Sequence, residues 1–125
     1  METIVFIHNR LSVTMLLFMV ALGLWGLWNF LRGEGMTGSY WGGLAIGEGL
    51  VVVQGLLGVL LYVLGGAPAR GILHILYGVV AMVSIPAAFS FTRGRSTRYE
   101  TLIYAIIALF LAGVSIRARL TGAGY

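Results

Sequence analysis

The sequence contains no cysteine, all eight of its basic residues are arginine, and all four of its acidic residues are glutamate. Without cysteine the chain has no disulfide, no thiolate metal site and no cysteine nucleophile. So few acidic groups make a calcium or magnesium site unexpected, because these ions need several oxygen ligands. The H-E-x-x-H, G-x-S-x-G and phosphate-loop motifs of common enzyme classes are missing as well. Enzyme activity is therefore the less favoured interpretation, and we expect no catalytic residue.

Charge is scarce throughout the chain. Only 10% of the 125 residues are charged and 59% are hydrophobic, whereas soluble domains carry about 25% charged residues. The net charge of +4 comes without a basic stripe interleaved with aromatic residues, so nucleic acid is not an expected partner. The composition predicts an integral membrane protein in contact with the lipid bilayer, whose arginines lie at helix ends near lipid phosphates.

Four apolar runs separated by short polar linkers predict the architecture. A helix needs roughly 20 apolar residues to cross the hydrocarbon core. We expect helices at about residues 8–31, 40–64, 71–92 and 99–117. The linkers are residues 32–38, 65–70 and 93–98. Because such short linkers join neighbouring antiparallel helices, the sequence predicts a single all-α domain, an up-down-up-down four-helix bundle in the membrane.

The aromatic and basic residues bear on how the bundle lies in the membrane. Tryptophan and tyrosine flank the first linker, as is typical of a membrane interface. Arginines divide equally between the two faces, but three of them lie in linker 93–98, which favours the cytoplasm for that linker. We therefore expect a plasma (inner) membrane protein with its N-terminus outside. The first apolar run is too long for a signal peptide, so we interpret it as a retained helix.

The two histidines are the most informative polar residues. His8 and His74 lie in the first and third expected helices, at heights that differ by roughly 7 Å at about 1.5 Å rise per residue. These helices are diagonal neighbours in a four-helix bundle, so two facing imidazoles could bind a haem iron as axial ligands. Arg10, Arg70 and Arg117 at the same face suit the haem propionates. The competing interpretation is that both histidines have only structural or hydrogen-bonding roles.

Two further polar residues lie inside the second expected helix. Glu48 either forms a structural ion pair with Arg32 or Arg93, or carries protons or contacts a quinone. Gln54 lies near the middle of the membrane, where an amide commonly ties helices together.

Small residues and one proline shape the second and third expected helices. Gly43 and Gly47 form a G-x-x-x-G step that continues through Gly58, which allows close helix packing or room for a flat cofactor. Pro86 is expected to kink the third helix in its second half.

Short motifs along the first three helices resemble one half of haem A synthase. They are IHNRL at residues 7–11, QGLLG at residues 54–58 and HILYG at residues 74–78. In that family a histidine-containing segment, a Gln-x-x-Leu-Gly helix and a second histidine helix follow one another in this order. The resemblance covers about residues 7–80.

The resemblance implies a haem held by paired histidines near the outer membrane face, with His8 and His74 as the matching ligands. The chain has one such half where a synthase has two. No acidic residue beside His8 matches the family's catalytic glutamate, because Glu48 lies toward the opposite face. We expect a b-type haem protein that transfers electrons or handles haem beside a respiratory or photosynthetic complex. The alternative is a cofactor-free accessory subunit packed against other membrane protein subunits.

Overall fold

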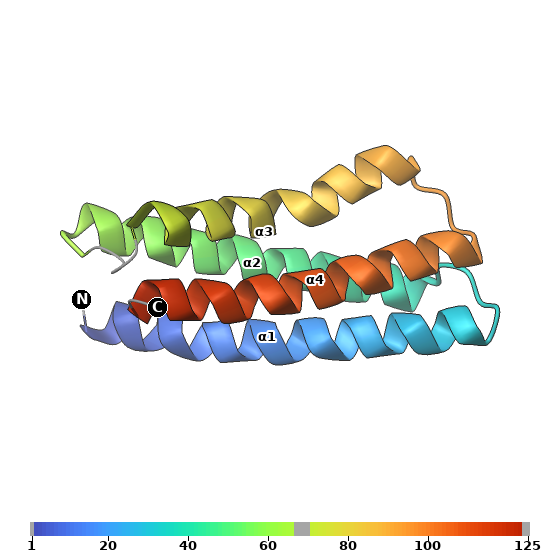
Figure 1. Cartoon of the computed structure of the whole chain (residues 1–125), viewed down its shortest axis with the longest axis horizontal. Coiled ribbons are helices and arrows are strands. Elements are labelled where there is room, and N and C mark those ends of the chain that lie inside the picture. Colours follow the sequence, from blue (N-terminus) through green and yellow to red (C-terminus); the bar gives the residue numbers. More distant parts are fainter. Residues whose placement is uncertain (1, 67–70, 124–125) are drawn as a thin grey trace.

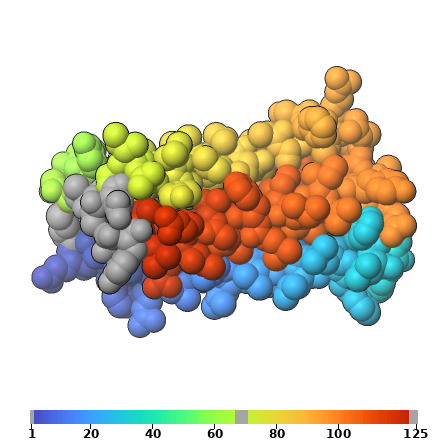
Figure 2. All heavy atoms as spheres, in the orientation of Figure 1, coloured from blue at the N-terminus to red at the C-terminus, as the bar shows by residue number. Residues whose placement is uncertain are grey.

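The computed structural model describes residues 2–66 and 71–123, which form four helices: α1 (Glu2–Leu31), α2 (Gly38–Val63), α3 (Gly71–Thr92) and α4 (Arg98–Ala123). Each helix is long and apolar enough to cross a membrane. The helices run alternately in opposite directions, and both ends of the chain lie at the same end of the bundle (Figure 1). The side chains fill an elongated body, seen in Figure 2. The prediction of an all-α antiparallel four-helix bundle is confirmed.

Two of the helices extend beyond the ends expected from the apolar runs. α1 begins at Glu2 instead of near residue 8, and α4 ends at Ala123 instead of near residue 117. The length of an apolar run reflects the thickness of the hydrocarbon core, but a helix can continue through polar residues in the membrane–water interface. The 30 residues of α1 span about 45 Å, well beyond a hydrocarbon core of roughly 30 Å. His8 therefore lies two turns inside α1, and the last residues of α4 lie beside α3.

The helices form a ring in which each one packs against its two neighbours along the chain, and α4 closes the ring on α1. The α1–α4 interface is the most extensive and α2–α3 the least. Glycine sets the close approach of α1 and α4, because a Cβ on Gly26 would lie 2.8 Å from the Cβ of Ala105. Small residues give membrane helices close packing in the absence of a hydrophobic force between them.

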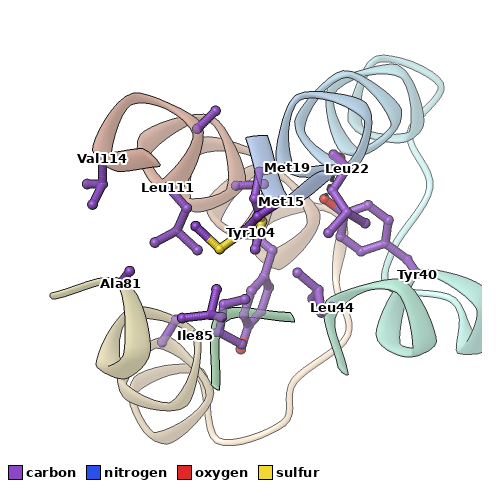
Figure 3. Close-up of a cluster of buried hydrophobic side chains, with 14 of the residues drawn as sticks. Met15, Met19, Leu22, Tyr40, Leu44, Ala81, Ile85, Tyr104, Leu111 and Val114 are labelled. Carbon is purple, nitrogen blue, oxygen red and sulfur yellow. Dashed lines mark hydrogen bonds between the residues drawn. The ribbon is translucent and has the colours of Figure 1, made fainter. Parts of the chain in front are cut away.

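The core lies between all four helices, as Figure 3 shows. Its largest buried side chains come from α1, α2, α3 and α4: Met15, Met19, Leu22, Tyr40, Leu44, Ile85, Tyr104 and Leu111. The two tyrosine hydroxyls are hydrogen-bonded, Tyr40 Oη to the carbonyl of Leu22 at 2.8 Å and Tyr104 Oη with Thr92 Oγ1 at 2.8 Å. A buried hydroxyl without a partner would cost about 1–3 kcal/mol, so these contacts let aromatic rings fill the core.

The predicted glycine step and proline both shape the packing of their helices. A Cβ on Gly43 would lie 2.8 Å from Leu22, and one on Gly47 would lie 3.1 Å from Met19. The G-x-x-x-G step therefore brings α2 close to α1. Pro86 lies inside α3, and the second half of this helix rises away from α2 in Figure 1, as expected where a proline removes a helical hydrogen bond.

Hydrogen bonds close the end of the bundle that carries the first and third linkers. They join these linkers or the adjoining helix ends: Met36 N to Ser96 O (3.0 Å), Thr101 Oγ1 to Glu34 O (3.1 Å) and Arg98 Nη2 to Phe30 O (3.0 Å). Glu100 is buried at the start of α4, where it accepts hydrogen bonds from Thr97 Oγ1 and from Arg95 Nε at 2.9 Å. Thr97 and Glu100 have the spacing of a capping box. This end of the bundle is thus tied across helices.

Candidate functional site

The two histidines meet in the interior of the bundle. His8 lies on the second turn of α1 and His74 on the first turn of α3, and their ring centroids are 6.4 Å apart with an interplanar angle of 63°. Since α1 and α3 are diagonal helices, the rings reach each other across the axis of the bundle. The structure therefore brings together the two residues that the sequence singled out as ligands.

The imidazole of His74 is held by α4. Its Nδ1 donates to the backbone carbonyl of Ala118 at 2.7 Å, and Thr121 Oγ1 lies 3.4 Å from the same nitrogen. A carbonyl oxygen only accepts, so Nδ1 carries the proton and Nε2 keeps its lone pair in the neutral ring. Histidines that bind metals usually donate their other ring N–H to such a carbonyl. Sequence reasoning missed both α4 residues, because the expected helix ended at about residue 117.

The imidazole of His8 lacks the hydrogen bond that fixes the ring of His74. Its Nδ1 is buried with no hydrogen-bond partner among the described residues. Gln54 Nε2 donates to the His8 backbone carbonyl at 2.8 Å, whereas Gln54 Oε1 is also buried and unpartnered. Gln54 ties α2 to α1, as predicted, and in doing so it supports a histidine of the site. Unpaired buried polar atoms are rare in native proteins and call for an explanation.

The other two helices contribute glycine at the level of the histidines. A Cβ on Gly58 of α2 would lie 3.5 Å from His8 Cε1. A Cβ on Gly122 of α4 would lie 3.0 Å from His74 Cε1 and 3.1 Å from its Nδ1. Each ring thus packs against a helix that has no side chain at this point. Two imidazoles on one diagonal thus pack against two glycines on the other.

The arginines expected around the site lie apart from the histidine rings. Arg10 is exposed, with its guanidinium 5.3 Å from the centre of the Phe6 ring. Arg117 is also exposed, on the helix that holds His74. Arg70 lies outside the described residues. Arg10 and Arg117 make no ion pair within the described part of the chain, so both guanidiniums have free donors near this end of the bundle.

The expected ion pair of Glu48 is wrong. Arg32 pairs instead with Glu34 at 2.8 Å, and no described arginine forms a salt bridge with Glu48. One carboxyl oxygen of Glu48, Oε1, is buried without a hydrogen bond. The side chain lies in a groove between α2 and α3, far from the histidines along the helix axis.

The centroid distance of the histidine pair is close to that of two imidazoles bound to one iron. Two rings bound to one metal through bonds of about 2 Å have centres roughly 6 Å apart, and the observed centroids are 6.4 Å apart. The hydrogen bond of His74, the unpartnered Nδ1 of His8 and the glycines at this level also fit a flat, twice-ligated cofactor. No group of three or more metal-binding side chains occurs among the described residues, so a metal held by protein ligands alone has little support.

No known protein family, curated protein or solved structure matches this chain. The resemblance to haem A synthase therefore stays a prediction from short motifs.

Proposed function

We propose that this protein binds a b-type haem between His8 and His74 in the membrane. The observation that carries the proposal is the meeting of two imidazoles from diagonal helices at 6.4 Å. A bound haem supplies a one-electron redox centre. His74 would ligate through Nε2 while Ala118 fixes its ring, and Arg10, Arg70 and Arg117 would pair with the propionates.

The corresponding role is electron transfer, or haem handling, beside a respiratory or photosynthetic complex in the plasma (inner) membrane. A chain with two axial histidines and no open coordination position suits electron transfer better than catalysis, because catalytic metal sites keep a position open. Among the described residues neither histidine pairs with a carboxylate, which supports the same role.

The test is the absorption spectrum of protein purified from cells supplied with haem. Sharp alpha and Soret bands after dithionite reduction are expected, and His74→Ala should abolish or shift them. Leu73→Ala is the matched control, because this neighbour is 41% exposed and lies outside the histidine pair. Wild-type protein without these bands would refute the proposal, as would bands that His8→Ala and His74→Ala both leave unchanged.

The proposed orientation places the histidine end outside, and the absence of native cysteine makes it directly measurable. Ser96→Cys introduces one thiol in the exposed third linker. A membrane-impermeant maleimide should label it in inverted vesicles and leave it unlabelled in intact cells. Labelling in intact cells would refute the orientation.

A cofactor-free accessory subunit is the second candidate. It is favoured by open glycines on the outside of α2, since nothing lies within 4 Å of a Cβ on Gly38, Gly42 or Gly49. A second membrane helix could approach closely along such a row. Co-purification with a larger complex and no chromophore in this chain would support this candidate over the haem protein.

A further inference from the structure

A groove between α2 and α3 contains an unpaired carboxyl oxygen inside the membrane-spanning region. The groove is open to its surroundings and has a volume of about 470 Å³, within the range of small-molecule sites. Its main lining residues are Trp41, Leu44, Ile85, Pro86, Phe89 and Glu48. Oε1 of Glu48 is buried and has no hydrogen-bond partner among the described residues. Ser90 lines the groove as well, so Glu48 and Ser90 are its polar side chains among otherwise apolar residues.

The bend of α3 accounts for the opening of this groove. Proline lacks an amide hydrogen, so Pro86 cannot bond to the carbonyl four residues before it. The second half of α3 rises away from α2 (Figure 1), and these two helices make the least extensive interface in the ring. Trp41 and Phe89 line the groove as an edge-to-face pair, with centroids 5.7 Å apart at 76°. The groove therefore offers aromatic surface beside a carboxyl group.

The partner of Glu48 must come from outside the described chain. Arg32 forms an ion pair with Glu34, and Arg95 forms one with Glu100. No described arginine forms a salt bridge with Glu48. A carboxyl group inside a membrane is costly unless it is hydrogen-bonded or paired. Because the groove opens between two lipid-facing helices, the partner has to dissolve in the bilayer. It also has to present a polar atom next to a flat body that suits the aromatic rings.

We propose that this groove binds a quinone, whose carbonyl oxygen accepts a hydrogen bond from the protonated carboxyl of Glu48 and whose ring lies against Trp41 and Phe89. A quinone combines bilayer solubility, a flat ring and a hydrogen-bonding oxygen, which are the three properties that the groove selects. The groove is separate from the histidine pair, since Glu48 and Gly58 are ten residues, or about 15 Å, apart along α2. The proposed quinone site and the histidine pair therefore occupy different parts of the bundle.

The test uses decylubiquinone and purified protein in nanodiscs, with quenching of tryptophan fluorescence as the binding signal. The part of the quenching that does not saturate comes from quinone dissolved in the lipid and is subtracted. We expect saturable binding by the wild type and a loss of affinity of at least fivefold in Glu48→Leu. Glu48→Gln should stay within about threefold of the wild type, because its amide can still donate one hydrogen bond. Ile46→Ala is the matched control, because Ile46 is exposed on the same helix and lines a different groove.

A second measurement guards against an indirect effect of the substitutions. The infrared band of the protonated carboxyl should shift when decylubiquinone is added, and it should be missing from Glu48→Gln. Equal affinity in Glu48→Leu and the wild type would overturn the proposal. So would quenching by decylubiquinone that does not saturate. Loss of a co-purifying membrane protein in Glu48→Leu, with no quinone binding by the wild type, would overturn it as well. A bound haem also quenches tryptophan, but the infrared shift does not depend on whether haem is present.

Discussion

Replacing Gly122 by alanine tests the histidine site, because it adds a single methyl group beside His74. The added Cβ would lie 3.0 Å from Cε1 and 3.1 Å from Nδ1 of His74. These distances are shorter than the 3.5–4.0 Å at which carbon atoms attract one another. The ring cannot move freely, because its Nδ1 is hydrogen-bonded at 2.7 Å to the carbonyl of Ala118, which lies one turn before Gly122 on α4. The methyl group and this hydrogen bond therefore compete for one position of the ring.

The opposing free energies can be compared. Replacing glycine by alanine inside a helix stabilises it by about 0.8–1 kcal/mol, but Gly122 is next to the last residue of α4, where this gain is smaller. Overpacking costs about 1–3 kcal/mol, and loss of the hydrogen bond costs about 0.5–1.5 kcal/mol net. The sum of these terms predicts that Gly122→Ala destabilises the protein by about 0.5–4.5 kcal/mol. Gly113→Ala is the control on the same helix, because nothing lies within 4 Å of its added Cβ, and it should be neutral or stabilising.

The assay is equilibrium unfolding in a mixed detergent, followed by helical circular dichroism, together with haem titration of each variant. Gly122→Ala should unfold more readily than Gly113→Ala and bind haem at least fivefold more weakly. Gly58→Ala should lie between them, since its Cβ would meet His8 at an ordinary 3.5 Å. Equal unfolding free energies and equal haem affinities for Gly122→Ala and Gly113→Ala would refute the close contact between α4 and His74.

Three further substitutions test the core, the support of the site and the closed end of the bundle. Tyr40→Phe removes the buried hydrogen bond to the Leu22 carbonyl and should lower the unfolding free energy by about 1 kcal/mol; unchanged stability would contradict that bond. Gln54→Leu removes the hydrogen bond to the His8 backbone carbonyl, but it also removes an unpaired buried oxygen. The unfolding free energy should therefore change by less than about 1 kcal/mol, whereas haem titration should show weaker binding. A loss of stability well beyond that range would contradict this balance. Glu100→Gln gives up the ion pair at the start of α4, so the midpoint of thermal unfolding should fall by a few degrees, and a midpoint equal to that of the wild type would show that the pair is not stabilising.

The fold could be predicted because the thickness of the bilayer sets the length of a spanning helix. Four apolar runs and three short linkers leave little freedom beyond an antiparallel ring. The height of His8 and His74 follows from the same constraint, so their proximity could be predicted too. The contacts of Ala118 and Gly122 could not, because they depend on how α4 is rotated about its axis and on how far it continues past the apolar run.

The partner of Glu48 was mispredicted for a physical reason. Arg32 lies near the same membrane face, but Glu34 is only two residues away from it in the linker. A short loop brings two charges together at little entropic cost, so the local pair is favoured. Arg93 follows the end of α3, beyond the bend at Pro86, where this helix has turned away from α2 (Figure 1). The nearness of Glu34 to Arg32 can be read from the sequence, whereas the direction of α3 after Pro86 cannot.

The distribution of unpaired atoms favours a ligand-binding protein over a purely structural subunit. The buried hydroxyls of Tyr40, Tyr104 and Thr92 all have hydrogen-bond partners. Among the described residues, the buried side-chain atoms without a partner are His8 Nδ1, Gln54 Oε1 and Glu48 Oε1. Two lie at the histidine pair and one in the α2–α3 groove. A subunit that only packs against others would gain stability from apolar residues at these positions, since an unpaired buried polar atom costs about 1–3 kcal/mol. The unpaired polar atoms therefore lie at the two places for which we propose a ligand, the histidine pair and the α2–α3 groove.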